Sequence, residues 1–260
     1  MSGKYTGISV EKRKNTGFVF FDNPEHNNRM GYAETVSLTE ALRDCDADND
    51  IRAIILSGKG GSFCTGGKID GFPDGPLVAQ KRYAEAGENA LLTFFNVSKP
   101  IIAAVNATAL AGGLMFIEAC DLAVAGRSVM FGLPEISRGY FPMLAMAVLQ
   151  KSLPKKRLFE LAFMNKLVSA ETMLEWNFIN EVTDDDKVLE RAEEIAAIIG
   201  SFSSVPVSFG RRTFYKMNDM NLSSSIDYSE CALLNLIWTD DVRETARAQE
   251  EGREPVYKGQ

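Results

Sequence analysis

Residues 99–126 read KPIIAAVNATALAGGLMFIEACDLAVAG, and their pattern predicts two strands with a loop and a short helix between them. The segments PIIAAVNA (100–107) and DLAVAGRSVMFG (121–132) are almost continuously apolar, which is typical of strands buried on both faces of a sheet. The spacing of apolar residues over 112–120 favours a helix. IRAIILSGKG (51–60) repeats the buried-strand pattern upstream. Strands that alternate with helices in this way predict an α/β core.

The pattern continues on both sides of this stretch. Residues 7–24, GISVEKRKNTGFVFFDNP, predict two strands joined by a turn near Asn15. Apolar residues at helical spacing follow at 34–50 and at about 77–97, and Gly and Pro cluster in an expected loop at 70–80. After about residue 143 the periodicity is helical, in the segments 143–153, 155–163, 169–179, 187–202, 206–218 and much of 222–251. The chain is therefore expected to be helical from about residue 143 onward.

Composition narrows the function classes. The chain has 260 residues with 45% hydrophobic and 24% charged residues, and its net charge of −7 argues against a broad nucleic-acid-binding face. No apolar run approaches the roughly 20 residues that span a membrane, and the first residues lack the apolar core of a signal peptide, so we expect a cytoplasmic protein that does not enter membranes. The four cysteines show no paired spacing and His26 is the single histidine. These counts predict neither a disulfide framework nor a metal site, and they argue against a histidine-based triad unless His26 serves it.

Two predicted strands end in glycine-containing loops. SGKGGSFCTGGKID (57–70) follows one strand and NATALAGG (106–113) follows the next. Glycine allows backbone N–H groups to approach a ligand closely, and two such loops at neighbouring strand ends could direct two N–H groups at one oxygen. If Gly112 begins a helix, the positive end of the helix dipole reinforces this oxyanion hole. The alternative is a pair of tight turns without function, and neither loop matches a nucleotide-phosphate motif.

Taken together, these segments resemble the crotonase (enoyl-CoA hydratase/isomerase) superfamily over nearly the whole chain. The resemblance rests on FFDNPEHNNRM, IRAIILSGKGGSFCTGGKID, KPIIAAVNATALAGGLMFIEACDLAVAG, FGLPEISRGYFP, AETMLEWNFINEV and the final PVYKG. It implies an α/β fold, a spiral of repeated ββα units, with the core in residues 1–198 and a helical oligomerisation region in 199–260. A homotrimer or a hexamer built as a dimer of trimers is expected, and apolar residues of the last third such as Leu233 and Leu234 agree with it.

The resemblance also implies which residues act. The N–H groups of Gly67 and Gly112 would bind the thioester oxygen and stabilise an enolate, and Glu135 would move protons. Coenzyme A enters as part of an acyl-CoA substrate, and no separate cofactor or metal is implied. The backbone from Gly67 to Asp70 would hold the CoA end, and His26 falls where relatives often have a basic residue near the nucleotide. The implied substrate-contacting residues are His26, Gly66, Gly67, Lys68, Ile69, Asp70, Gly112, Met115 and Met143.

The chain departs from the hydratase pattern at one catalytic position. Hydratases of this superfamily use two glutamates, and the position of the first is Met115 here, while the second matches Glu135. Glu118 lies three residues further along the same predicted helix and is a weak candidate for the missing role.

Other departures surround the site. Lys68 stands where members of the superfamily commonly have an acidic residue, just after the first oxyanion residue. Ala107 and Ala111 stand where they have glycines in the second loop, and Met143, Ala145 and Met146 stand where hydratases have small residues, mainly glycine. We therefore expect an apolar pocket that raises the pKa of Glu135.

One carboxylate best fits a 1,3-proton shift that moves a double bond of an enoyl-CoA between the 3,4 and 2,3 positions, a reaction type of fatty acid metabolism. The main alternative is hydration or dehydration of an enoyl-CoA, with Glu118 or an ordered water in the missing role. Thioester hydrolysis and decarboxylation also occur in the superfamily. A hypothesis of a different class is a binding protein that has lost catalysis, for example an RNA-binding one. The acidic composition and the presence of Glu135 with both oxyanion positions argue against it.

Overall fold

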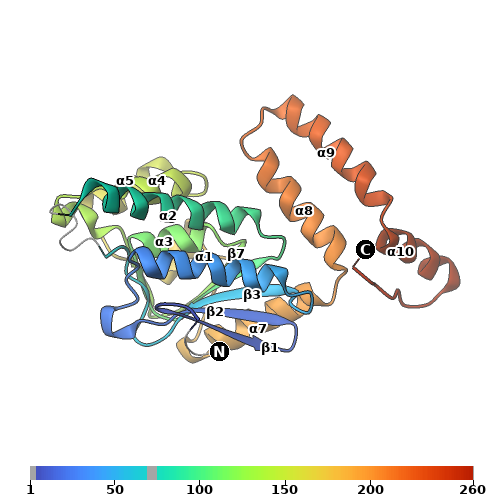
Figure 1. Cartoon of the computed structure of the whole chain (residues 1–260), viewed down its shortest axis with the longest axis horizontal. Coiled ribbons are helices and arrows are strands. Elements are labelled where there is room, and N and C mark those ends of the chain that lie inside the picture. The colour runs from blue at the N-terminus through green and yellow to red at the C-terminus, as the bar shows by residue number, and fades with distance from the viewer. Residues whose placement is uncertain (1–3, 69–74, 260) are drawn as a thin grey trace.

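The computed structural model describes residues 4–68 and 75–259, and its centre is a mainly parallel sheet (Figure 1). Within the described residues this sheet has the order β1-β2-β3-β5-β7-β10, and only the β1–β2 pair is antiparallel. Its strands are β1 (Ile8–Arg13), β2 (Thr16–Phe21), β3 (Ala53–Gly58), β5 (Ile101–Val105), β7 (Leu122–Gly126) and β10 (Glu181–Thr183). Every residue of β2, β3 and β5 is buried, and for β3 and β5 the nearly continuous apolar sequence predicts this.

A second, smaller sheet stands beside the first. In the described part of the chain its order is β4-β6-β8-β9, from β4 (Ser62–Cys64), β6 (Thr108–Leu110), β8 (Met130–Gly132) and β9 (Val168–Ser169). The chain passes from β3 to β4, from β5 to β6 and from β7 to β8, so each turn places one strand in each sheet and then enters a helix. This repetition is the predicted spiral of ββα units.

Helices cover both faces of the large sheet (Figure 1). The core helices are α1 (Tyr32–Ala47), α2 (Leu77–Asn96), α3 (Gly112–Glu118), α4 (Met143–Leu149), α5 (Lys155–Met164), α6 (Ala170–Glu175) and α7 (Val188–Gly200), with 3-10 turns η1 (Pro24–His26), η2 (Pro134–Arg138) and η3 (Asp185–Lys187). The apolar stripe Val188, Ala192 and Ala196 of α7 packs on one face of the sheet, against residues that include Phe18 and Ile55. The inward sides of α1, α2 and α3 belong to the larger core cluster on the other face.

The last helices, α8 (Ser204–Met217), α9 (Leu222–Ile237) and α10 (Asp240–Glu251), project from the core (Figure 1). Buried Arg211 attaches α8: its Nε donates to the Asp121 carboxylate at 2.8 Å and its Nη2 donates to the carbonyl of Phe94 at 2.6 Å. The Tyr215 hydroxyl donates to the same carboxylate at 2.7 Å. Asp121, which lies between α3 and β7, thus joins the α/β core to the helical region.

Some expectations about the elements need correction. The loop expected at 70–80 is wrong for residues 77–80, which form the first turn of α2, and 70–74 lie outside the described residues. The helical pattern of 222–251 is interrupted near Trp238 and forms two helices. The expected boundary between 198 and 199 falls inside α7 and stays a prediction. Among the described helices, none is long and apolar enough to cross a membrane.

Candidate active site

The two glycine loops meet where the small sheet passes into helices. Gly66, after β4, packs against the beginning of α3 so closely that a methyl group on it would lie 2.5 Å from the Ala111 Cβ and 3.3 Å from the Gly112 nitrogen. Gly66 also has a φ of +97°, a conformation that glycine adopts without strain. Only glycine therefore fits here, and the contact brings the Gly66–Gly67 peptide beside the Ala111–Gly112 peptide.

Both expected oxyanion donors are available in this arrangement. Within the described chain, neither the Gly67 N–H nor the Gly112 N–H donates a hydrogen bond to another residue, and Gly112 is the first residue of α3, where N–H groups have no partner in the helix. The carbonyl of each peptide is occupied: Gly66 O accepts from the Met30 N–H at 2.8 Å, and Ala111 O accepts from the Leu114 N–H at 3.0 Å. An amide that accepts a hydrogen bond at its oxygen becomes a stronger donor at its nitrogen.

Ala111 holds a strained conformation just before Gly112. Its φ of 54° and ψ of −123° lie where side chains with a Cβ are disfavoured, at a cost of about 1–3 kcal/mol. The Ala111 N–H donates to the Gly132 carbonyl at 2.9 Å, which links the loop to β8. The alanine that replaces a glycine in the sequence thus sits in a glycine-like conformation, and strain of this kind gathers at sites where geometry is functional.

Glu135 lies in the first turn of η2, directly after β8. Its Oε2 is buried and has no hydrogen-bond partner among the described residues. Burial raises the pKa of Glu135, opposed in part by a hydrogen bond from its own backbone and by the charge of Arg138. The direction of this shift agrees with the expectation, and it suits a carboxyl group that accepts and returns a proton.

Met115 and Glu118 lie on the same short helix, α3, but they face different parts of the structure. Met115 is 7% exposed, and its Cε lies 3.9 Å from the position that a Cβ on Gly112 would take. Glu118 is the last residue of α3, at the opposite end from Gly112, and it accepts a hydrogen bond from the Ser152 hydroxyl. Burial raises the pKa of Glu118 to about 7.

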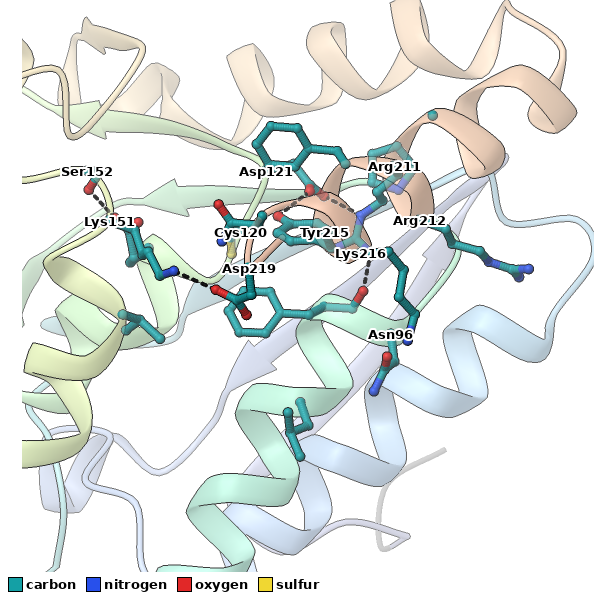
Figure 2. A pocket seen from close by; sticks show the side chains of 18 of the residues that line it. Asn96, Cys120, Asp121, Lys151, Ser152, Arg211, Arg212, Tyr215, Lys216 and Asp219 are labelled. Carbon is teal, nitrogen blue, oxygen red and sulfur yellow. Dashed lines mark hydrogen bonds and ion pairs between the residues drawn. The ribbon is translucent and has the colours of Figure 1, made fainter. Parts of the chain in front are cut away.

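Glu118 is one of the residues that line a groove of about 1260 Å³ between the core and α8. Asp121, Arg211 and Tyr215 form one wall of this groove, and the Lys151–Asp219 ion pair crosses its other side (Figure 2). Glu118 therefore lies near the contacts that attach the C-terminal helices to the core, at the end of α3 away from Gly112.

The remaining expected residues are spread around the first loop. His26 ends η1 on an exposed turn. The Lys68 ammonium pairs with Glu34 of α1, and the Lys68 N–H donates to the Met30 carbonyl at 2.9 Å. Ile69 and Asp70 lie outside the described residues. Their contacts with a substrate stay predictions.

Met143 and its neighbours lie at the beginning of α4. Met143 is 72% exposed, so most of its side chain faces solvent, and the expected bulk beside Glu135 stays a prediction. Ala145 is buried and Met146 packs partly on the core. No group of residues suited to hold a metal ion occurs in the part of the chain that the structure describes.

Two residues behind the first loop, Arg29 and Tyr83, were not predicted from the sequence. Arg29 donates from Nε and Nη2 to the Gly67 carbonyl at 3.4 and 3.2 Å. The Tyr83 hydroxyl donates to the Met30 carbonyl at 2.9 Å, and burial raises the pKa of Tyr83 to about 12. Arg29 stands in the quoted segment FFDNPEHNNRM and could have been noticed there, whereas Tyr83 has no local signal.

Comparison with known proteins finds relatives that match nearly the whole chain. The sequence profile of the enoyl-CoA hydratase/isomerase family matches residues 11–260. The chain is 29% identical over 259 residues to (E)-benzylidenesuccinyl-CoA hydratase of Thauera aromatica, covering 97% of this chain and 99% of that protein. It is 29% identical over 253 residues to enoyl-CoA hydratase EchA19 of Mycobacterium tuberculosis, covering 96% and 95%. The crystal structure of human enoyl Coenzyme A hydratase domain-containing protein 3 superposes with a TM-score of 0.92 at 25% identity, covering 97% and 100%.

Proposed function

The chain belongs to the enoyl-CoA hydratase/isomerase family, and we propose that it isomerises enoyl-CoA thioesters with Glu135 as its single acid–base group. Family membership makes it an enzyme of the crotonase superfamily with an acyl-CoA substrate. The choice of isomerisation depends on the site. The observation that carries it is the apolar Met115 side chain beside Gly112, where a hydratase of the superfamily has its other glutamate.

In the proposed reaction the thioester oxygen accepts hydrogen bonds from the N–H groups of Gly67 and Gly112. The Glu135 carboxylate removes a proton from C2 of a 3-enoyl-CoA, and the electrons move into the dienolate whose oxygen the two N–H groups stabilise. The same carboxyl group then returns the proton to C4, which leaves the double bond between C2 and C3. Loss of one such donor in other enzymes costs about 2.7–4 kcal/mol, so the backbone pair supplies much of the rate enhancement.

Hydration is the second candidate, because the relatives at 29% identity carry the name hydratase. Hydration needs a water that is oriented and deprotonated at C3. Met115 can do neither, and Glu118 faces the groove beside α8. A hydratase reading would therefore require an ordered water that is held by Glu135 alone.

The test compares a 3-enoyl-CoA and a 2-enoyl-CoA of equal chain length, with the products identified by mass and absorbance. We expect the 3-enoyl substrate to be converted to the 2-enoyl product faster than the 2-enoyl substrate is hydrated. Efficient formation of 3-hydroxyacyl-CoA without isomerisation would establish the hydratase alternative. Binding of thioesters without any turnover would favour the non-catalytic reading, and binding of RNA at low salt would support that reading further.

We also propose a homotrimer or a dimer of trimers. In the described chain α9 has no buried residue, although it carries exposed apolar side chains at Leu222, Ile226, Leu233, Leu234 and Ile237. Exposed apolar side chains in this number on one helix favour a protein–protein contact. The number three comes from the family resemblance.

A further inference from the structure

The proposed first oxyanion donor, the Gly67 N–H, lies in a segment whose own residues do not fix its direction. Gly66 and Gly67 are adjacent glycines, which have the widest backbone freedom of all residues. Neither has a side chain that could anchor the Gly67 N–H in one direction. An oxyanion donor must be held in place before the reaction, because reorientation during the reaction reduces its benefit. Some other part of the chain must therefore fix this peptide.

The segment before α1 supplies these contacts. The Met30 N–H donates to the Gly66 carbonyl at 2.8 Å and the Met30 carbonyl accepts from the Lys68 N–H at 2.9 Å, which forms an isolated parallel bridge around Gly67. The Thr65 hydroxyl donates to the Asn27 carbonyl at 2.8 Å just upstream. The carbonyl of Gly67 itself remains outside this bridge.

The Arg29 guanidinium occupies that remaining carbonyl. Nη2 and Nε approach Gly67 O at 3.2 and 3.4 Å, a forked contact that a planar guanidinium can make and a lysine ammonium makes less well. The peptide before the Gly67 Cα is held through Gly66 O, and the peptide after it is held on both sides, by Met30 through the Lys68 N–H and by Arg29 through Gly67 O. The positive charge of Arg29 also lies on the loop that, in the proposed reaction, would face the developing enolate.

We propose that Arg29 is a positioning residue for the Gly67 oxyanion donor and acts on the substrate through that loop. This inference rests on the proposed use of Gly67 as a donor. It predicts that loss of Arg29 lowers kcat more than it raises KM, because the donor matters most when charge develops on the oxygen. We expect a decrease in kcat of about 10-fold for Arg29→Met, smaller than the 10²–10³-fold that follows removal of a whole donor.

The experiment uses Arg29→Met and Arg29→Lys, with Arg43→Met as the matched control. Arg43 donates to the Thr93 hydroxyl at 3.4 Å, so its loss removes an arginine contact at another place. Two quantities are measured: kcat and KM with the enoyl-CoA that the protein converts, and the absorbance shift of bound 2,4-hexadienoyl-CoA. The shift reports polarisation of the thioester carbonyl and needs no turnover, so it separates a failure of this inference from a failure of the isomerase proposal.

We expect Arg29→Met to lose part of the shift, Arg29→Lys to recover some of it, and Arg43→Met to match the wild type. A full shift and an unchanged kcat in both Arg29 variants would overturn the inference. So would weaker binding with an unchanged shift, because Arg29 would then be a ligand contact. Absence of any shift in the wild-type protein would overturn both the inference and the role of Gly67. Circular dichroism shows whether each variant is folded, and Arg29→Lys keeps the test valid if Arg29→Met does not fold.

Discussion

Replacing Glu135 with glutamine should remove activity and at the same time stabilise the protein. The carboxyl group is the proposed proton carrier, and its loss typically lowers the rate by about 10²–10⁴-fold, which corresponds to about 2.7–5.4 kcal/mol of transition-state stabilisation. The backbone donors at Gly67 and Gly112 are unaffected by a side-chain change. Binding of acyl-CoA should therefore persist in Glu135→Gln.

The gain in stability follows from the unpaired Oε2 of Glu135. An unsatisfied buried polar group costs about 1–3 kcal/mol, and glutamine removes the charge but keeps a polar atom, so we expect a gain of about 1 kcal/mol near pH 8. For a chain of this size that is an increase in Tm of about 2–4 °C.

The pH dependence has a definite sign. Because the folded pKa of Glu135 is raised, its contribution to stability is fully present below the ordinary glutamate pKa and is lost as the pH rises through the folded pKa. The stabilisation of Glu135→Gln relative to the wild type should thus grow over that window and stay constant above it.

The assays are steady-state turnover of a 3-enoyl-CoA and thermal unfolding at pH 4 and pH 8. Glu175→Gln serves as the control, since Glu175 is exposed at the end of α6. A wild-type rate in Glu135→Gln would move the catalytic role elsewhere. If Glu135→Gln is less stable than the wild type at pH 8, the carboxylate of Glu135 is paired in the folded protein. That result would refute the argument that an unpaired, buried carboxyl group serves as the proton carrier.

The other predictions concern the second acid position, the attachment of the helical region and the assembly. Met115→Glu adds a second carboxylate at a buried position, so it should raise the rate of hydration of a 2-enoyl-CoA about 10-fold or more and lower Tm. Product analysis measures the hydration and thermal unfolding measures Tm. An unchanged rate of hydration would contradict the role given to Met115. Arg211→Met should lower the free energy of unfolding by about 3–5 kcal/mol, because the Asp121 carboxylate loses its buried ion-pair partner. Limited proteolysis should then cut α8–α10 faster than in the wild type. Resistance equal to that of the wild type would contradict this prediction. Sedimentation at micromolar concentration should give a trimer or its dimer, and Leu233→Glu on α9 should weaken it; a monomer mass for the wild type would count against the assembly.

Much of the core could be predicted from sequence because its signals are local. A strand buried on both faces must be apolar at every position, and β3 and β5 show this without knowledge of their neighbours. The glycine loops, α3 and the position of Glu135 after a strand follow from the same short-range patterns, and the family resemblance supplied their roles. The strands β4, β6, β9 and β10 have at most three residues each, too few for a period to be recognised.

Only the tertiary structure decided which of these residues act on one another. Arg29 is 38 residues from the Gly67 carbonyl that it contacts, and Arg211 is 90 residues from Asp121. Glu118 is three residues from Met115 on the same short helix. The first turn of α3 lies at the glycine loops, whereas its last residue, Glu118, faces the groove beside α8. Periodicity determines whether a side chain points into the core, since that depends on the backbone alone. Which partner it meets there depends on how distant segments pack, and no local pattern contains that information.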